Sequence, residues 1–483
     1  MENSHPKPHA IMFPLPYQGH VTPCIHLAMK LASKGFTITF INTQKIHQQI
    51  AKSQPNNSGE DIFQEARRSG LDIRYKTMSD GFPLGFDRMK NNEQFRASRL
   101  SVLPALVDEL VGSIIKADPS VSCLIADSFF VWNSHIANKY NLVNISFWTE
   151  PALVFNLYYF LDLLKVNGHY ASKDNKEDII DYIPGVKAIN PKDLTSFLQE
   201  KDTTTNIHPT IEKAFGDVKN ADIIIINTVE ELEPDAIKAL REKQLVYTLG
   251  PVFPFENGAP TKTMVPTNMR TQLDCSKWLD TKPDASVLYI SFGSFIPAKK
   301  NDIVEIAHGI SLSKVNFIWV LRSDAVSYDE SFVLPPGFEE EIKERGLIVP
   351  WCNQIEVLFH RAVGGFLTHC GWNSILESVW CGVPLLCFPL LMDQPTNRKL
   401  VVGDWKVGLD LCDGKPLTRL EVAEKIDSLM NGELGEELRK ETMKVRQTMR
   451  NAWVKDGSSE KNLCQLTTDS RLSTRKMKRE LFF

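Results

Sequence analysis

The chain alternates short apolar runs with helical stretches along nearly its whole length. Most of the runs are apolar on both faces, which is the pattern of strands buried on both sides of a sheet. They fall at residues 10–14, 36–42, 71–75, 122–126, 143–148 and 222–227, and again at 286–292, 316–322, 346–350, 364–368 and 383–389. Strands of this kind belong to parallel sheets covered by helices. The predicted fold class is therefore α/β, with doubly wound, Rossmann-like sheets.

The chain is too long for one ordinary hydrophobic core, because 483 residues predict two domains. A stretch rich in Pro, Gly and Thr at 249–268 separates the two groups of strands and suits a linker. We predict an N-terminal domain at 1–250, a linker at 251–277, a C-terminal domain at 278–455, and a C-terminal segment at 456–483 that braces the N-terminal domain and ends in a frayed tail. The two domains should face each other across a cleft.

The composition argues against several classes of protein. A net charge of −4 disfavours a nucleic-acid-binding protein. No apolar run approaches the roughly 20 residues that span a bilayer, and the N-terminus lacks the pattern of a secretion signal. Nine cysteines without C-x-x-C pairs indicate reduced thiols in a cytoplasmic protein. The motifs of dinucleotide oxidoreductases, P-loop NTPases and α/β-hydrolases are absent, as is the D-x-D of many metal-dependent sugar transferases.

A histidine follows the first predicted strand. The next segment predicts a helix with Thr22 as its cap, Pro23 in its first turn and Gly35 at its exit. His20 would precede the positive end of this helix, which favours a neutral imidazole able to accept a proton. Asp127 ends another predicted strand at the same edge of the sheet, so the two side chains can meet. The alternatives are a bystander histidine and an aspartate that caps a helix.

The stretch FLTHCGWNS, at residues 366–374, places polar side chains where a buried strand gives way to a helix. The free N–H groups and the dipole of a helix start make such a turn a binding site for anions. His369, Trp372, Asn373 and Ser374 lie there. Helix capping would explain one or two of these residues, whereas an anion site accounts for the whole set.

Residues 351–394 resemble the signature box of the plant family 1 UDP-dependent glycosyltransferases in length and at nearly every fixed position. Other segments resemble landmarks of this family in the family's order. They are YQGHVTP near the start, ADSF (126–129), FWTEP (147–151), INTVEELE (226–233), WLDTKPDASVLYISFGS (278–294) and LPPGFEEEIKERGLIVPW (334–351). The resemblance covers nearly the whole chain. It implies the GT-B fold, in which two Rossmann-like domains face each other across a cleft.

The resemblance also implies a role for individual positions. Trp351 would stack on the uracil, with Gln354 and the backbone of Cys352 completing the nucleotide pocket. Glu377 would hold the ribose hydroxyls, although Ser374 and Glu377 also match a capping box. The diphosphate would contact His369, Trp372, Asn373, Ser374 and Ser294, and the sugar would contact Asp393, Gln394 and Thr149. In this family a glutamine at the last position of the box tends to accompany glucose.

These features predict an inverting glucosyltransferase that uses UDP-glucose as co-substrate. His20 would take a proton from a hydroxyl (or carboxyl) of a small lipophilic acceptor, such as a terpenoid, a flavonoid or another phenolic. Asp127 would orient His20, and the product would be a β-glucoside. We expect a monomer that needs no cofactor and no metal.

Two other functions stay open on the sequence alone. One is a nucleotide-sugar-binding protein without catalysis, and the other is an NAD-type oxidoreductase on the same architecture. The acceptor pocket is expected in the N-terminal domain, from segments 76–100 and 150–200. Residues 80–89 and 153–164 are apolar and aromatic enough to line it, but they are equally consistent with ordinary core.

Overall fold

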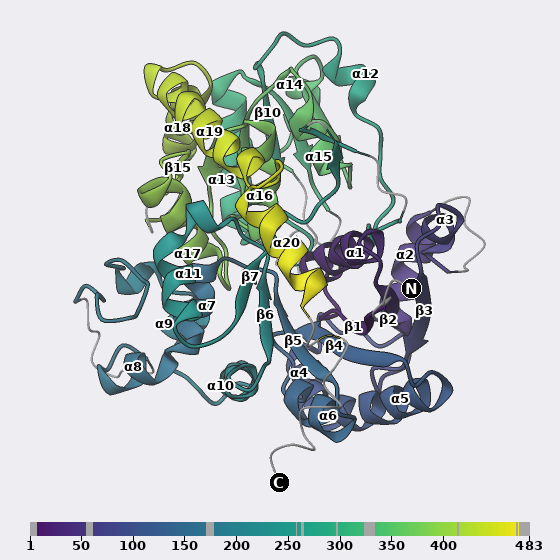
Figure 1. The fold of residues 1–483 in the computed structure, drawn as a ribbon. Coiled ribbons are helices and arrows are strands. Elements are labelled where there is room, and N and C mark those ends of the chain that lie inside the picture. The colour runs from purple at the N-terminus through teal and green to yellow at the C-terminus, as the bar shows by residue number, and fades with distance from the viewer. Residues whose placement is uncertain are drawn as a thin grey trace.

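The computed structural model describes residues 7–54, 61–170, 178–256, 258–261, 265–295, 298–322, 334–412, 415–469 and 472. Within these residues the chain forms two parallel β-sheets, each flanked by helices (Figure 1). We call the half built on the first sheet the N-terminal lobe and the half built on the second sheet the C-terminal lobe. The predicted α/β class, with two doubly wound sheets, is confirmed.

The sheet of the N-terminal lobe has seven parallel strands in the order β3-β2-β1-β4-β5-β6-β7. The strands are β1 (His9–Phe13), β2 (Thr37–Thr43), β3 (Ile73–Met78), β4 (Val121–Asp127), β5 (Val143–Trp148), β6 (Ile223–Ile226) and β7 (Val246–Thr248). Every residue of β1, β5 and β6 is buried, as their apolar sequences predict. The chain order reverses between β1 and β4, and ligands of such sheets bind at that switch point, beyond the carboxyl ends of the strands.

The sheet of the C-terminal lobe has six parallel strands in the order β12-β11-β10-β13-β14-β15. The strands are β10 (Val287–Ser291), β11 (Asn316–Val320), β12 (Gly346–Val349), β13 (Val363–Thr368), β14 (Leu385–Cys387) and β15 (Gly408–Asp410). Its switch point lies between β10 and β13. A two-stranded sheet of β8 (Phe255–Glu256) and β9 (Ala259–Pro260) stands in the stretch between the lobes.

Helices connect the strands and cover the sheets (Figure 1). In the N-terminal half they are α1 (Gln18–Ser33), α2 (Gln44–Ser53), α3 (Gln64–Arg68), α4 (Asn92–Ser101), α5 (Leu103–Ala117), α6 (Asn133–Lys139), α7 (Ala152–Tyr159), α8 (Leu161–Val166), α9 (Ser196–Gln199), α10 (Ile207–Val218) and α11 (Pro234–Arg241). They continue with α12 (Ser276–Leu279), α13 (Lys300–Ser313), α14 (Phe338–Ile342), α15 (Gln354–Phe359), α16 (Trp372–Cys381), α17 (Gln394–Lys399), α18 (Arg419–Met430), α19 (Glu433–Asn451) and α20 (Ser458–Thr468). No helix in the described part of the chain is both long and apolar enough to cross a lipid bilayer.

Helix α1 begins earlier than its sequence predicts. It starts at Gln18 rather than at Thr22, so Pro23 lies inside the helix. Pro23 has no N–H, and the carbonyl of Gly19 therefore lacks its usual partner four residues ahead. The side-chain amide of Asn373, in the C-terminal lobe, donates to that carbonyl at 2.8 Å. A contact between the lobes thus satisfies the group that the proline leaves free.

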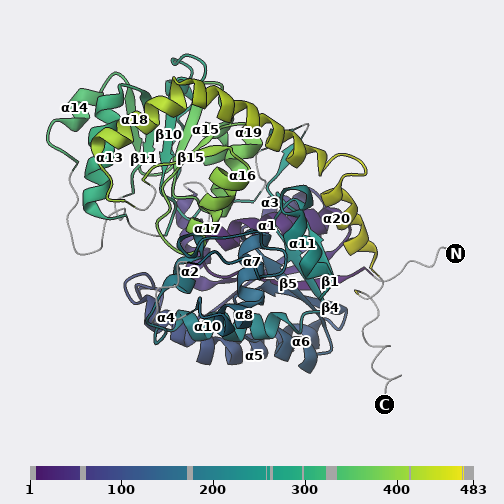
Figure 2. The ribbon, with the colours of Figure 1, turned by 90° about the vertical axis from the view of Figure 1, so that its left-hand side faces the viewer.

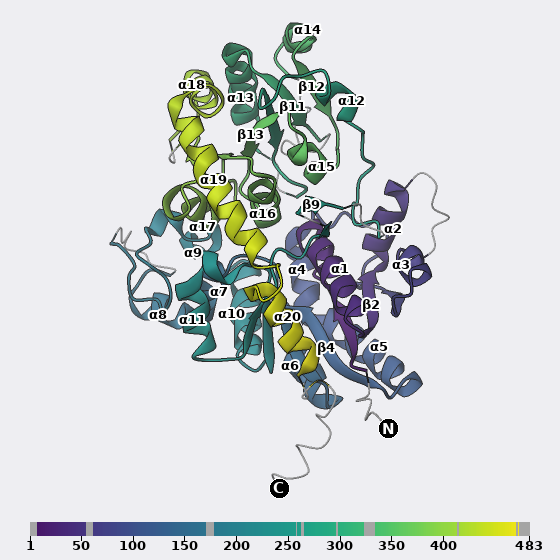
Figure 3. The same ribbon diagram turned by 45° about the horizontal axis from the view of Figure 1, so that its top comes forward.

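The last described helix returns to the N-terminal lobe (Figures 2 and 3). Helix α19 packs on α16 and α18 of the C-terminal lobe, whereas α20 packs on β7. The Asn462 amide donates to the carbonyl oxygen and to the hydroxyl of Thr248, at 3.1 and 2.7 Å. The Ser459 hydroxyl donates to the Gly250 carbonyl at 2.9 Å. The domain boundaries at 250, 277 and 455 stay predictions, and the expected frayed tail from residue 473 onward lies outside the described residues.

Candidate active site

A cleft of about 470 Å³ lies between the carboxyl ends of the two sheets. Its volume falls within the roughly 300–1,000 Å³ typical of sites for small molecules. Every predicted site residue except Asp127 lines it. These residues are His20, Thr149, Ser294, Trp351, Cys352, Gln354, His369, Trp372, Asn373, Ser374, Glu377, Asp393 and Gln394. The fold therefore gathers positions from both lobes into one space.

His20 and Asp127 meet at the switch point of the N-terminal sheet. His20 lies in the first turn of α1, and Asp127 is the last residue of β4. The Nδ1 atom of His20 is 2.8 Å from Oδ2 of Asp127 and 2.9 Å from the hydroxyl of Thr149. An ionised carboxylate can only accept, so the imidazole proton sits on Nδ1 and Nε2 remains free to accept a proton in the cleft.

The alternative role for Asp127, capping the next helix, is wrong. Helix α6 begins after Trp132, and no side chain of the described residues caps it. The second carboxylate oxygen of Asp127 accepts from the main-chain N–H of Phe129 at 3.0 Å, within the turn that follows β4. Asp127 is 3% exposed and His20 15% exposed, so the carboxylate supports the ring from behind.

The phosphate-binding turn predicted at 366–374 is formed by the end of β13 and the start of α16. The N-cap of α16 is Gly371, and no side chain caps the helix. The first N–H groups of α16 therefore face the cleft without a side-chain partner among the described residues, and they carry the positive end of the helix dipole.

His369 fills a narrow space beside this turn. A Cβ atom on Gly293 or on Gly371 would come within 2.4 or 2.5 Å of its Nε2, so both positions need glycine. Burial lowers the pKa of His369 to about 4, which keeps the ring neutral. A hydrogen bond to the backbone of Ser291 partly offsets this shift, and Nδ1 is left without a hydrogen-bond partner among the described residues.

The capping-box interpretation of Ser374 and Glu377 is also wrong. Ser374 is the third residue of α16 and not its N-cap. Instead, the Gln354 amide donates to the Ser374 hydroxyl at 3.0 Å and to Glu377 Oε2 at 2.8 Å. Burial raises the pKa of Glu377 to about 7, and the hydrogen bond from Gln354 partly offsets this shift. The three side chains form one polar wall of the cleft.

Trp351 and Cys352 stand where the chain leaves β12. The indole N–H of Trp351 donates to Asn268 at 3.4 Å, and the Arg270 guanidinium lies 5.8 Å from the indole ring. Cys352 is buried, with its sulfur 3.6 Å from the hydroxyl of Tyr289. The Trp351 ring is half-buried at the edge of the cleft, so part of it can be covered by a planar ligand.

Trp372 and Asn373 also hold the two lobes together. The buried indole of Trp372 donates to the Asn227 carbonyl of the N-terminal lobe at 2.8 Å. Asn373 donates to Gly19, as described above. In this structure both side chains are engaged across the cleft, so a ligand at the turn first meets the main-chain N–H groups of α16.

Asp393 and Gln394 lie at the start of α17. Burial raises the pKa of Asp393 to about 6, while the hydrogen bond from Asn397, at 2.5 Å, and the charge of His20 lower it. The Gln394 side-chain oxygen accepts from the N–H groups of Leu390 and Leu391, at 2.8 and 3.0 Å. Its amide nitrogen has no hydrogen bond among the described residues and remains available to a ligand.

Sequence reasoning assigned no role to Glu150, which also lines the cleft. It precedes α7. The first N–H groups of α7, on Ala152 and Leu153, donate to the carboxylate of the buried Glu233. Glu150 is therefore not needed as a cap. Burial, together with the nearby charges of Asp393 and Asp127, raises its pKa well above the ordinary value.

Neither of the two apolar stretches proposed as acceptor walls lines the cleft as a whole: 80–89 is mostly exposed or half-buried, whereas 153–164 is mostly buried core. No residue of 80–89 lines the cleft, and of 153–164 only Tyr158 does. The cleft instead takes Arg96 and Arg99 from α4 and Phe197 from α9. Basic residues on a helix normally indicate a solvated face, and no sequence pattern distinguished Arg96 and Arg99 from exposed arginines.

The described residues contain no group of three or more His, Cys, Asp or Glu side chains that could hold a metal ion. All nine cysteines are described, and they are free thiols.

Comparison with known proteins agrees with this architecture. Residues 212–450 match the family model "UDP-glucoronosyl and UDP-glucosyl transferase". The chain is 54% identical to UDP-glycosyltransferase 86A1 of Arabidopsis thaliana over 471 residues, 96% of this chain and 95% of the relative. It is 35% identical to 7-deoxyloganetin glucosyltransferase of Gardenia jasminoides, over 94% of this chain and 95% of that one. The crystal structure of UDP-glucose:anthocyanidin 3-O-glucosyltransferase in complex with UDP superposes with a TM-score of 0.80 at 26% identity, covering 98% of this chain and 100% of the other.

The fold and the cleft thus define a glycosyltransferase of the GT-B class, with two Rossmann-like lobes. The chain belongs to the plant family 1 UDP-glycosyltransferases and is an enzyme of that family. This membership excludes the oxidoreductase that the architecture alone had left open.

Proposed function

We propose that the protein transfers glucose from UDP-glucose to a hydroxyl (or carboxyl) of a small lipophilic acceptor, with inversion to a β-glucoside. The observation that carries this proposal is the His20–Asp127 pair, which faces the start of α16 across one cleft. A proton acceptor and an anion site stand on opposite walls, with room for a sugar and an acceptor between them.

His20 acts as the general base. Its Nδ1 is engaged by Asp127 and Thr149, so Nε2 is the nitrogen that takes the acceptor proton. The acceptor oxygen then forms a bond to the anomeric carbon as the bond to UDP breaks on the opposite face. Asp127 stabilises the imidazolium while it exists.

The C-terminal lobe binds the departing UDP. The N–H groups of α16 and the hydroxyl of Ser294 are fixed donors toward the developing charge of the diphosphate, and the neutral His369 lines the same turn. We assign the uracil to Trp351 and Gln354 and the ribose to Glu377. These donors provide the stabilisation that a metal would otherwise supply, so we propose that the reaction needs no metal and no cofactor.

The sugar lies between Asp393, Gln394 and Thr149. His20 is among the groups that lower the pKa of Asp393, which supports assigning Asp393 to a sugar held near the base. The free amide nitrogen of Gln394 is a donor for a sugar hydroxyl. The relatives named above include a 7-deoxyloganetin glucosyltransferase and a glucosyltransferase for anthocyanidin. These names support glucose as the donated sugar and a terpenoid, a flavonoid or another phenolic as the acceptor.

The free thiols suit a cytoplasmic enzyme, and we propose that it acts there as a monomer. The function is tested by incubating the purified enzyme with UDP-glucose and a mixed library of aglycones, and measuring both UDP release and glucosides by mass spectrometry. Acceptor-dependent UDP release with β-glucosides is expected. Binding of UDP-glucose without transfer to any aglycone would instead identify a nucleotide-sugar-binding protein.

A further inference from the structure

Two arginines on α4 line the N-terminal side of the cleft. Arg96 and Arg99 are one turn apart and therefore share a face of the helix. Arg99 is only 8% exposed, and its Nε is buried without a hydrogen-bond partner in the described part of the chain. Among those same residues no carboxylate lies within ion-pair distance of it. Arg99 is thus a buried cation that faces the cleft.

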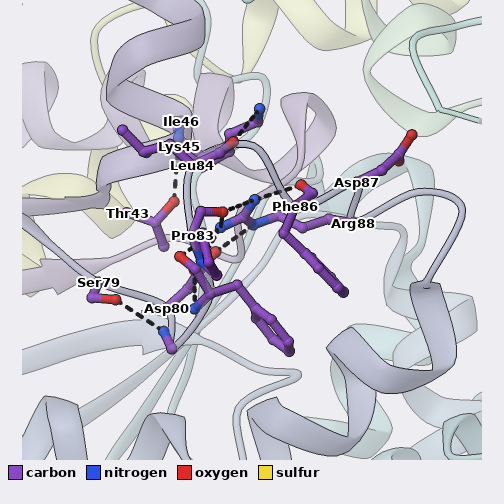
Figure 4. A network of polar contacts seen from close by, with 12 residues as sticks. Thr43, Lys45, Ile46, Ser79, Asp80, Pro83, Leu84, Phe86, Asp87 and Arg88 are labelled. Carbon is purple, nitrogen blue, oxygen red and sulfur yellow. Dashed lines mark hydrogen bonds and ion pairs between the residues drawn. The ribbon is translucent and has the colours of Figure 1, made fainter.

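Two carboxylates in the neighbourhood of Arg99 are already engaged. Asp80 shares a small neighbouring cavity with Arg99. However, Arg88 binds Asp80 through two hydrogen bonds of 2.6 and 2.7 Å, and both side chains are largely buried (Figure 4). Glu93 pairs with Arg96 at 3.0 Å. The protein therefore supplies Arg99 with no counter-charge from these groups.

Aromatic rings surround the Arg99 guanidinium. It lies 5.7 Å from the ring centres of both Tyr17 and Phe95. These contacts orient the guanidinium and shield it from water, but they do not neutralise it. A buried charge without a partner is strongly unfavourable. An anion that enters the cleft would remove this cost.

Tyr17 links Arg99 to the catalytic centre. The Tyr17 ring lies 6.4 Å from the imidazole of His20 and 5.7 Å from the Arg99 guanidinium. The Phe295 ring packs against Tyr17 at 4.9 Å. The distance from the base to the guanidinium is therefore spanned by an aromatic surface, which suits the body of a flat acceptor.

We propose that the acceptor is a hydroxylated aromatic carboxylic acid whose carboxylate binds Arg99 while its hydroxyl reaches His20. The planar guanidinium can form two parallel hydrogen bonds with a carboxylate. Arg96 lies at the same wall, but Glu93 already balances its charge, so Arg99 is the residue assigned to the carboxylate. This inference rests on the proposed function and narrows its acceptor from lipophilic compounds in general to acids that carry a separate hydroxyl.

The test compares three acids of increasing length, 4-hydroxybenzoate, 4-hydroxyphenylacetate and 4-hydroxycinnamate, each with its methyl ester. For at least one pair, the acid should exceed the ester in kcat/KM by about tenfold or more, and the product should be the phenolic glucoside. In Arg99→Met the ratio of kcat/KM for the acid to kcat/KM for the ester should fall close to one. In Arg99→Lys this ratio should lie between the values of wild type and Arg99→Met. Arg68→Met, at an exposed residue of α3, is the matched control and should behave as wild type.

Calorimetry of the same ligands with the UDP-bound enzyme measures binding without transfer. Loss of acid binding in Arg99→Met, with a melting temperature equal to or above that of wild type, supports the site. A lower melting temperature with unchanged acid binding would show that Arg99 is structural. The inference is also overturned if wild type binds acid and ester equally or binds neither of them. Formation of a glucose ester as the product, or weaker UDP binding in Arg99→Met, would overturn it too.

Different results would refute the proposed glucosyl transfer and the proposed carboxylate site at Arg99. Transfer to neutral phenols with no preference for acids would leave the proposed function standing and remove the carboxylate site. Arg99-dependent binding of acids with no transfer to any acceptor would keep the site and remove the proposed function.

Discussion

The Nδ1 atom of His20 lies 2.8 Å from Oδ2 of Asp127, although 107 positions separate the two residues in the chain. The parallel pairing of β1 with β4 brings them together, since His20 follows β1 and Asp127 ends β4. The C-terminal sheet repeats this arrangement, with Ser294 after β10 and His369 after β13. Each lobe thus presents its own switch point to the cleft.

His20→Ala removes the proposed base. Turnover should fall by about 10²–10⁴, the usual contribution of a positioned base, because the acceptor hydroxyl keeps its proton. UDP binding should stay close to wild type, since the nucleotide is assigned to the other lobe. Kinetics with an identified acceptor and calorimetry with UDP measure both effects. His135→Ala, at an exposed residue of α6, is the control, and near-full activity of the His20 variant would refute the mechanism.

Asp127→Asn and Thr149→Val separate the two partners of His20 Nδ1. The asparagine keeps the shape of the side chain but loses the charge that stabilises imidazolium, so kcat should fall, though by less than in His20→Ala. Thr149→Val replaces only the hydroxyl by a methyl group, so the fall in kcat should be smaller than in Asp127→Asn or His20→Ala. The double variant tests coupling, because two side chains that act through one ring should not give additive losses. A fully active Asp127→Asn enzyme would exclude Asp127 from the catalytic unit.

Gln394→His should shift donor preference from UDP-glucose toward UDP-galactose. The change replaces the free amide nitrogen that we assign to a sugar hydroxyl. It also removes the oxygen that fixes the N–H groups of Leu390 and Leu391. The measurement is a competition assay with both donors in one reaction, read as the ratio of products. An unchanged ratio would count against sugar recognition at this position.

Glu377 should make the unliganded enzyme less stable as the pH rises. Its pKa is raised to about 7 in the folded protein, chiefly by burial. The neutral form is therefore favoured by folding, and its stabilising contribution is complete below the unfolded pKa and is lost as the pH passes through about 7. The loss is about 1–3 kcal/mol.

The measurement for Glu377 is the melting temperature between about pH 5 and about pH 8. Wild type should lose more stability over this range than Glu377→Gln, which cannot ionise. Glu424→Gln, at an exposed residue of α18, serves as the control and should follow wild type. Parallel curves for wild type and Glu377→Gln would contradict the raised pKa.

The longer strands could be predicted from sequence because each is a continuous apolar run, and the run at 143–148 matches β5 residue for residue. The strands β7, β8, β9 and β15 were missed, because two or three residues on their own give too little pattern, whereas the equally short β14 was found inside the longer apolar run at 383–389. The start of α1 was placed too late because Pro23 usually marks a first turn. A proline inside this helix is tolerated since Asn373, which is distant in sequence, supplies the missing donor.

The places of His20 and His369 in the cleft, and of Asp127 behind His20, were predictable because all three lie at or after the ends of strands. The contact between His20 and Asp127 within the N-terminal lobe was predicted as well, whereas the hydrogen bonds that cross between the lobes were not. The Trp372 indole, for example, is held by Asn227, which no local pattern connects with it. Arg99 shows the same limit, since only the packing of α4 against the rest of the N-terminal lobe shows that the side chain is buried and has no ion-pair partner among the described residues.

Helix α20 has a mechanical consequence. Because it is anchored to β7 by Asn462 and Ser459, the chain passes between the halves twice, once before β10 and once after α19. Two connections restrict the relative motion of the lobes to a hinge rotation. Substrate entry should therefore proceed by rotation about one axis, and cleavage of one connection would leave the lobes joined by the other.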